Sequence, residues 1–299
     1  MNTFKNLGLV GAAALALIAS QAFATPTPVC SFTAPATGNP TYGAPVCISQ
    51  VGLDGAGTGL QNVLSPYNAI TNPHGIIASG PGVNVYTGQT VPSAYWAIDG
   101  GTSTSASQIL LELAGNANSN TFGIFDPNNP SNSLQLFSGP ASAGYKTVLI
   151  KNSLGTGYTA IYLMPNGSYI GQSSATFSVA NLFGYYLGTP SYGFFYSDPK
   201  LNAPGTGGAY PLGMPHMAAY LGNGTNTLNV AGGGLWGPGE YIMAWEDTPF
   251  ISSDLDYQDF IVAVESVHPV PEPAGLGLFG LGLVGLLFAV WLRRRHHNG

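Results

Sequence analysis

Apart from its two ends, the chain consists of short apolar runs separated by glycine, proline and asparagine. Outside the termini, no stretch keeps an apolar period of 3.6 residues for three turns, as an amphipathic helix would. Short runs rich in Val, Ile, Tyr and Phe that end at turn residues are typical of β-strands. The sequence therefore predicts an all-β fold, an antiparallel β-sandwich or jelly-roll-like domain.

The expected strands become regular from Gln108 onward, and the last two are the clearest. Apolar runs predict strands at residues 75–77, 83–86, 95–98, 109–113, 121–125, 134–137, 147–150, 159–163, 183–187, 193–196, 241–245 and 260–264. We expect a β-sandwich domain at 105–266. An extension with the first strands would precede it at 25–104, and a linker would follow at 267–273.

The N-terminus has the three parts of an export signal. Lys5 is the only charged side chain in the first 24 residues, an apolar stretch follows at 7–19, and small residues stand at Ala22 and Ala24. This pattern predicts a signal peptide at 1–24, removed by signal peptidase. An uncleaved anchor is the alternative, but a bilayer needs about 20 apolar residues.

The C-terminus has a second apolar segment, at 274–292, with no charge in 19 residues. At about 1.5 Å per residue, a helix of this length can cross a hydrocarbon core of roughly 30 Å. Arg293, Arg294 and Arg295 follow directly. Such a cluster stays on the cytoplasmic side, so we expect one transmembrane helix, a basic cytoplasmic tail at 293–299 and a body outside the cell membrane.

A short motif, Pro271-Glu272-Pro273, stands just before this segment. With the glycine-rich span and the terminal arginines, residues 270–295 resemble the PEP-CTERM sorting signal. This tail is also labelled the ice-binding protein C-terminal domain, a name that implies no ice binding. The resemblance implies an exosortase-type membrane protease as partner, in a bacterium that makes exopolysaccharide. The protein would be held briefly in the inner membrane and then reach the cell surface or the extracellular space. An ordinary single-span anchor is the alternative.

The negative charge of the predicted exported body argues against nucleic acid as a partner. Between residues 25 and 269 there are three lysines, no arginine and 12 acidic side chains. Nucleic-acid binding depends on neutralising phosphates with Lys and Arg, so we expect no nucleic-acid partner.

Cys30 and Cys47 are the only two cysteines, and both lie near the mature N-terminus. In an oxidising compartment such a pair is most simply a disulfide, which would contribute about 3 kcal/mol by restricting the unfolded chain. A metal site is the alternative, but no further ligands are close in sequence.

Acidic residues gather between the last two predicted strands. The connection contains Glu246, Asp247, Asp254, Asp256 and Asp259. Oxygen ligands of this kind suit Ca²⁺, which takes about six to eight of them. The connection is not an EF-hand, because the sixth position from Asp254 is Asp259 rather than glycine. The alternative is a set of side chains that cap strands and turns by bonding to backbone N–H groups.

The same stretch, Glu-Asp followed by Ser-Asp-x-Asp-Tyr-x-Asp, resembles an uncharacterised family of secreted domains in bacterial surface proteins. The resemblance covers about residues 105–266 and includes the segments 120–126, 195–198 and 215–220. It implies a β-sandwich and no known activity. The family usually has Asn at the position of Gln258, so a carbonyl ligand there would lie one methylene further out.

Catalytic motifs are weak throughout the chain. There is no Gly-x-Ser-x-Gly elbow and no His-x-x-x-His pair, and Glu112 and Glu240 lie in unrelated contexts. The aromatics at 185–196 and Trp96, Trp236 and Trp245 would either bind a polysaccharide or pack in the core. We expect a non-enzymatic protein with a structural or adhesive role. The alternatives are a secreted polysaccharide-acting enzyme, a glycan-binding module and a module for another small ligand.

Overall fold

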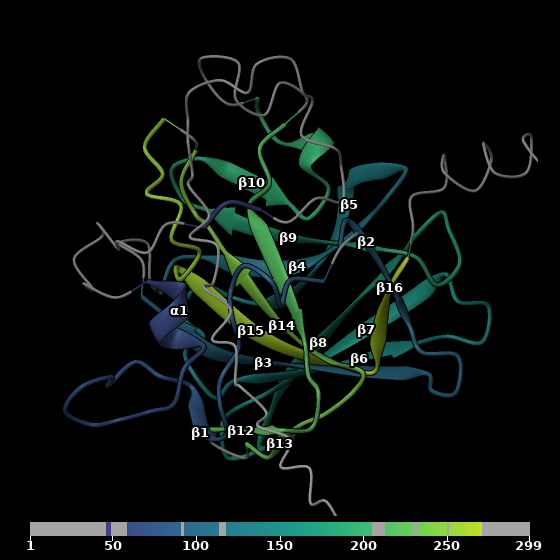
Figure 1. Ribbon diagram of the computed structural model, residues 1–299. Helices are drawn as coiled ribbons and strands as arrows, with labels where there is room; N and C mark the ends of the chain where they lie inside the picture. Colours follow the sequence, from purple (N-terminus) through teal and green to yellow (C-terminus); the bar gives the residue numbers. More distant parts are fainter. Residues whose placement is uncertain are drawn as a thin grey trace, which may run out of the picture.

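The computed structural model describes residues 46–48, 59–90, 93–113, 118–204, 213–229, 233–249 and 251–270 (Figure 1). The predicted signal peptide, the predicted transmembrane segment and the basic tail lie outside these ranges. Within them, no helix has the length and apolar character that crossing a bilayer requires.

The described chain is almost entirely β-structure, which confirms the predicted all-β class. In chain order the elements are α1 (Leu60–Val63), β1 (Ile77–Ser79), β2 (Tyr95–Ile98), β3 (Thr104–Glu112), β4 (Thr121–Asp126), β5 (Asn129–Phe137), β6 (Lys146–Lys151), β7 (Gly157–Leu163), β8 (Tyr169–Thr176), β9 (Gly184–Thr189), β10 (Gly193–Tyr196), a 3₁₀ turn η1 (Pro199–Leu201), β11 (Met217–Leu221), β12 (Asn226–Leu228), β13 (Leu235–Trp236), β14 (Glu240–Trp245), β15 (Phe260–Glu265) and β16 (Val267–Val270).

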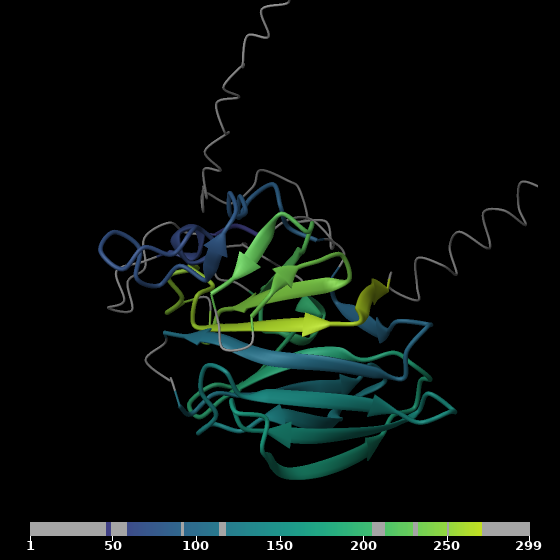
Figure 2. The same ribbon diagram turned by 90° about the horizontal axis from the view of Figure 1, so that it is seen from below.

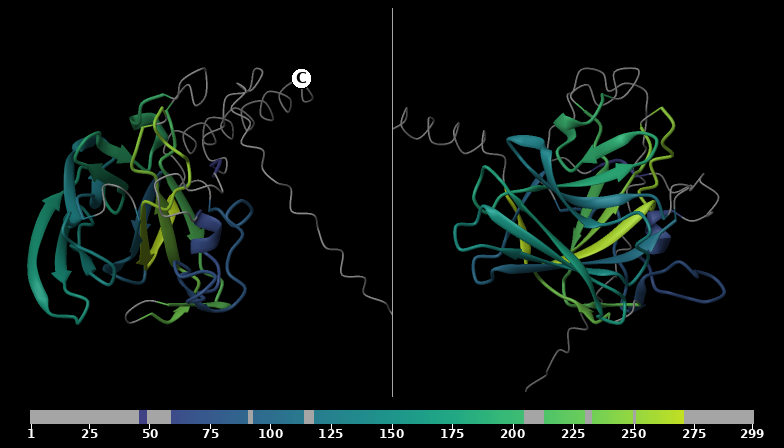
Figure 3. Two further views of the ribbon diagram at one scale, coloured as in Figure 1. Left: turned by 90° about the vertical axis from the view of Figure 1, so that its left-hand side faces the viewer. Right: turned by 180° about the vertical axis from the view of Figure 1, so that it is seen from behind.

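Two antiparallel sheets form the sandwich. The larger has the strand order β11-β14-β15-β3-β6-β7-β8, and Figure 2 shows these strands side by side, with the yellow β15 between β14 and β3. The smaller has the order β10-β9-β4-β5. Figure 3 gives two further views of this arrangement. Two short sheets, β1-β12-β13 and β16-β2, complete the fold.

The main core lies between the two large sheets and is rich in aromatic rings. Phe122 of β4 stacks on Phe260 of β15 with ring centroids 5.4 Å apart, and it meets Trp245 of β14 edge-on at 5.9 Å. All three side chains are fully buried. Large rings on facing strands fill the space between the sheets and contribute beyond their buried area.

A second core covers the other face of the larger sheet at β11, β14, β15 and β3. Along β14, Tyr241, Met243 and Trp245 enter the main core, whereas Ile242 and Ala244 enter the second one. The N-terminal segment, with α1 and β1, supplies the opposing side chains of this second core. Because both faces are buried, β14 has no polar alternation, and its continuous apolar run was a clear strand signal.

The predicted strand at 83–86 is wrong. The side chain of Asn84 accepts hydrogen bonds from the backbone N–H groups of Tyr86 and Thr87, both at 3.0 Å. This local turn replaces sheet pairing, as asparagine side chains commonly do. Several strands were not expected, among them β8, whose side chains are exposed or half-buried, and β16, which pairs with β2 inside the segment assigned to a linker.

One close approach between strands gives a test of the packing. A Cβ atom at Gly184 of β9 would overlap the ring of Phe125 on β4, whereas a Cβ at Gly171 of β8 would meet only Tyr162, at 3.9 Å. We expect Gly184→Ala to destabilise the protein by about 1–3 kcal/mol because the ring must move. Gly171→Ala is the matched control and should change little. Denaturant unfolding measures both, and equal effects would contradict this packing.

Candidate metal centre

The acidic connection leaves and re-enters the middle of the larger sheet. β14 and β15 pair antiparallel with Trp245 opposite Phe260, so residues 246–259 form a loop at one end of this hairpin. The predicted strand–connection–strand arrangement is therefore confirmed. The backbone N–H of Leu113, just after β3, donates to the carbonyl of Asp259 at 3.2 Å, so a third strand also ends at this corner.

Three of the five predicted carboxylates come together. One oxygen from each of Glu246, Asp256 and Asp259 lies within 4.8 Å of the others, and all three side chains are buried. Asp247 is also buried but lies outside this group of three, and Asp254, in the middle of the loop, is half-buried. We call Glu246, Asp256 and Asp259 the carboxylate triad.

Two residues of the loop adopt an unusual backbone conformation. Leu255 and Tyr257 have φ angles of 61° and 54°, in the left-handed region. This conformation costs roughly 1–2 kcal/mol per residue for side chains other than glycine. Both side chains are buried in the second core, and the Tyr257 hydroxyl donates to the carbonyl of Pro215 at 2.6 Å. Core burial thus fixes the loop that carries Asp256.

Hydrogen bonds inside the loop hold the carboxylates in place. The N–H of Asp247 donates to Asp259 Oδ2 at 2.8 Å, and Thr248 Oγ1 donates to Glu246 Oε1 at 2.6 Å. Gln258 Nε2 donates to Asp256 Oδ2 at 2.7 Å. These hydrogen bonds are of the kind expected if the acidic side chains only cap strands and turns. They position the triad but bring no positive charge to it.

The electrostatics of the triad are unfavourable for three ionised groups. Burial, followed by the charges of Asp254 and Asp247, raises the pKa of Glu246 to about 7, against hydrogen bonds that lower it. Burial and the charges of Glu246 and Asp247 also raise the pKa of Asp259. Among the described residues, the charges that shift the pKa of these two carboxyls are all negative. Carboxylates in this state gain from a proton or a bound cation.

One oxygen of the triad lacks a partner. Glu246 Oε2 is buried and makes no hydrogen bond to any described residue, although Oε1 of the same carboxylate is bonded to Thr248. A buried polar atom without a partner costs free energy, and native structures contain few of them. The triad therefore has an open acceptor in a buried, negatively charged setting.

His216 supports the corner without joining the triad. Its Nδ1 lies 3.0 Å from the carbonyl of Glu246, and the N–H of Glu246 donates back to the His216 carbonyl. The imidazole stacks on Phe195, and burial lowers its pKa to about 4. A neutral ring that donates its Nδ1–H to the carbonyl of Glu246 fits this geometry. The two hydrogen bonds between His216 and Glu246 thus fix the start of the loop.

Sequence reasoning did not assign two further polar side chains to this corner. Asn120, before β4, donates from Nδ2 to Asp247 Oδ2 at 2.9 Å, while its Oδ1 is buried and has no hydrogen-bond partner in the described part of the chain. Glu112, at the end of β3, has its pKa raised to about 7, mainly by burial and further by Asp247. Neither is near the loop in sequence. Glu112 reaches the corner because β3 pairs with β15, and Asn120 reaches it because β4, a strand of the smaller sheet, packs across the core on β14 and β15.

Some of the aromatic residues are buried, as core packing requires, and others are exposed, as polysaccharide binding would require. Trp96, Trp236 and Trp245 are fully buried, as core packing requires. In the crowded segment 185–196, Tyr192 and Phe194 are the exposed large side chains, at 47 % and 53 %.

Only one of the two cysteines of the predicted disulfide lies within the described residues. Cys47 is disulfide-bonded. Cys30 lies outside the described residues, so its pairing with Cys47 stays a prediction.

Comparison with known proteins identifies the C-terminal tail. Residues 269–295 match the PEP-CTERM protein-sorting motif, which covers the predicted signal from Pro271, Glu272 and Pro273 to Arg293, Arg294 and Arg295. The chain is therefore an exported protein that is sorted to the cell surface or the extracellular space and processed by exosortase, a membrane protein. No curated protein and no solved structure gives a significant match. The resemblance of the body to a secreted domain family stays a prediction.

The buried carboxyls predict an unusual pH dependence in metal-free buffer. The folded-state pKa of Glu246, about 7, lies above its ordinary value of 4.5, so folding favours the protonated form. Its contribution is fully present below pH 4.5 and is lost as the pH rises towards 7. For one such group the loss is about 3 kcal/mol. Denaturant midpoints measured from pH 4.5 to 7 should therefore fall, and Glu246→Gln should flatten the decline. A midpoint that rises over this range would contradict the assignment.

Proposed function

We propose that this protein is a non-enzymatic component of the cell surface or extracellular matrix. Its β-sandwich would have a structural or adhesive role within an exopolysaccharide layer, with Ca²⁺ bound at the acidic corner. The sorting motif supports the destination. The carboxylate triad, with its unpartnered buried oxygen, is the observation that carries the metal proposal.

The chemistry of the corner favours a hard cation. The triad offers carboxylate oxygens only, and Asp247, Asp254 and the amide of Gln258 lie beside it in the same loop. Ca²⁺ takes about six to eight oxygen ligands in flexible geometry, so these groups and water could complete its coordination. Softer metals prefer imidazole or thiolate, and His216 directs its Nδ1 to a carbonyl.

The position of the triad gives the cation a structural role. Glu246 directly follows β14 and Asp259 directly precedes β15, so one ion would join the two ends of the loop. These strands lie between β11 and β3 in the larger sheet, and their side chains enter both cores. A bound cation would therefore oppose opening of the hairpin on which both cores depend.

The enzyme alternative has little support from the two candidate glutamates. Glu112 lies across from Phe260 on β15, whereas Glu240 lies across from Glu265 at the other end of the same strand. At about 3.3 Å per residue, five residues of strand separate them by roughly 16 Å. An acid–base pair on a glycosidic bond needs carboxyls about 5–9.5 Å apart. Glu112 and Glu240 therefore do not form such a pair.

Calcium should stabilise the full-length protein purified in a non-ionic detergent. At a Ca²⁺ concentration 100 times the Kd, binding adds about 2.7 kcal/mol. For a domain of this size that raises the thermal midpoint by roughly 5–10 °C relative to chelator. Asp256→Asn combined with Asp259→Asn should abolish the increase, because two triad oxygens lose their charge.

Asp126→Asn is the control for this experiment. Its carboxylate accepts from the backbone and hydroxyl of Ser178, away from the triad. It should lower the midpoint equally with Ca²⁺ and with chelator, so the calcium-dependent increase should persist. A wild-type midpoint that ignores Ca²⁺, or an increase that survives the double substitution, would overturn the metal proposal.

Replacing Pro271, Glu272 and Pro273 by alanine should block processing in a host with an active exosortase. The expected result is a several-fold accumulation of the longer precursor in the inner-membrane fraction, because the protease no longer recognises its extended peptide. Ser266→Ala, just upstream of the motif, should be processed normally. Immunoblots of membrane and culture medium measure both, and normal release of the triple variant would refute exosortase sorting.

A further inference from the structure

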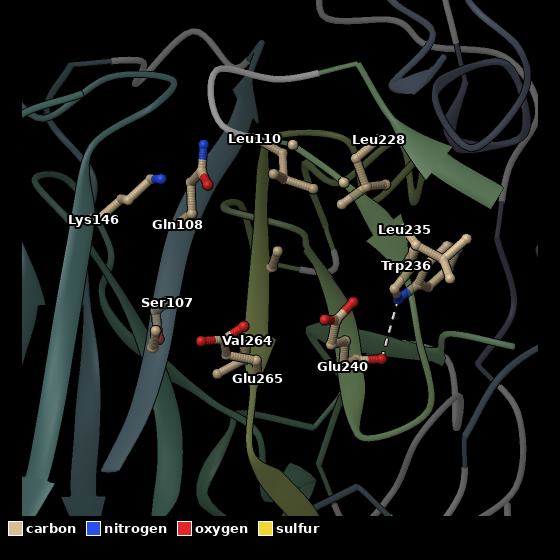
Figure 4. A pocket seen from close by; sticks show the side chains of 14 residues that line it. Ser107, Gln108, Leu110, Lys146, Leu228, Leu235, Trp236, Glu240, Val264 and Glu265 are labelled. Atoms are coloured by element: carbon tan, nitrogen blue, oxygen red, sulfur yellow. Dashed lines mark hydrogen bonds between the residues drawn. The ribbon is translucent and has the colours of Figure 1, made fainter. Parts of the chain in front are cut away.

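A groove lies on the second-core face of the larger sheet, at the end opposite the acidic corner. Figure 4 shows it between β3, β15 and β14 on one side and β13 on the other. Its volume is about 280 Å³, near the lower limit for small-ligand sites. One wall is apolar, with Leu110, Leu228 and the exposed Leu235. The small residues Ala106 and Ala263 leave space along the sheet.

Two carboxylates lie side by side on the floor of this groove. Glu240 of β14 lies directly opposite Glu265 of β15, so both side chains project from the same face. Like charges directly opposite on neighbouring strands are destabilising. Burial and the charge of Glu240 raise the pKa of Glu265, and Lys146 acts in the opposite sense. Two like charges therefore lie side by side in the groove, and because Glu265 is exposed, solvent screens part of their repulsion.

The surrounding contacts relieve this repulsion only in part. Glu240 Oε2 accepts from the N–H of Gly237 at 2.7 Å, which fixes its position. Among the described residues, no ion pair within 4.0 Å includes Glu240, Glu265 or Lys146. Gln108 and Lys146, on β3 and β6, also line the groove. The floor thus combines two acceptor groups with an amide and an ammonium, beside an apolar wall.

We propose that this groove binds a hydroxyl-rich ring that carries a primary ammonium group, such as an amino-sugar residue of a polysaccharide. The ammonium would lie between Glu240 and Glu265 and offset their repulsion. The apolar face of the ring would contact Leu228 and Leu235, and Gln108 and Lys146 would bond to hydroxyl groups. This site goes beyond the proposed function, because it shares no residue with the calcium corner.

Other ligand classes fit the groove less well. Ca²⁺ needs more oxygen ligands than two carboxylates supply. An anionic ligand would be repelled by the same pair. A purely apolar ligand would leave the carboxylates desolvated and unpaired, which is costly. An uncharged sugar would use the wall and the amide but would leave the repulsion in place.

Calorimetric titration of the full-length protein in non-ionic detergent and Ca²⁺ tests this site. The ligands are a disaccharide of glucosamine, its N-acetylated counterpart and n-butylamine. We expect the glucosamine disaccharide, whose amino groups are unmodified, to bind at least about tenfold more tightly than either comparison ligand. This ratio corresponds to about 1.4 kcal/mol. Glu240→Gln combined with Glu265→Gln should reduce this affinity at least tenfold, and Leu235→Ala should weaken it without changing any charge.

Asp99→Asn is the control for charge removed outside the groove, and it is compared with each single variant, Glu240→Gln and Glu265→Gln, which also removes one charge. Asp99 lies just outside the groove, where it pairs with His268 at 2.8 Å. This substitution should leave the affinity for the glucosamine disaccharide unchanged if Glu240 and Glu265 contact the ligand directly. Loss equal to that of a single glutamate variant would indicate general attraction to a negatively charged protein and would overturn the site. Equal binding of the N-acetylated disaccharide or n-butylamine would also overturn it. The thermal midpoint with Ca²⁺ checks folding and tests the calcium proposal separately.

Discussion

The antiparallel pairing of β14 with β15 is the contact on which the rest of the structure depends. Side chains on one face of this hairpin fill the core between the sheets, and those on the other face meet α1 and β1. Because both faces are buried, a slip of one residue would exchange the two sets of side chains and disrupt both cores. The acidic loop closes this hairpin, so its internal geometry is linked to the strands that the whole domain is packed around.

That dependence explains why a buried group of acids is retained at the corner. Leu255 and Tyr257 adopt left-handed conformations so that their side chains reach the second core, and Asp256 is held beside Glu246 and Asp259 as a result. Strain of this kind persists only where surrounding contacts determine the conformation. The arrangement lowers the stability of the metal-free domain, and the proposed cation would convert the same carboxylates into a link between two central strands.

Much of this arrangement could be predicted from the sequence, and the failures have physical causes. The continuous apolar runs of β14 and β15 predicted both strands and the acidic connection between them. The turn at Asn84 was missed because a side chain, rather than a partner strand, takes up the backbone N–H groups. β8 was missed because its exposed side chains lack an apolar run. Glu112 reaches the corner through the pairing of β3 with β15, and Asn120 reaches it through the packing of one sheet on the other; no local sequence pattern records either contact. Glu240 and Glu265 also lie opposite each other only because of the register between β14 and β15, which no local pattern records.

The last strand, β16, bears on how the protein is presented at its destination. β16 pairs with β2 as far as Val270, opposite Tyr95, and Val270 immediately precedes Pro271 in the sequence. The exported domain is therefore hydrogen-bonded up to the residue where the sorting motif begins, and no separate stalk stands between them. A protease that acts at this motif must work within reach of the folded domain. Any anchor attached there would leave only a few residues of chain between the sandwich and the membrane, so the groove would be presented close to that surface.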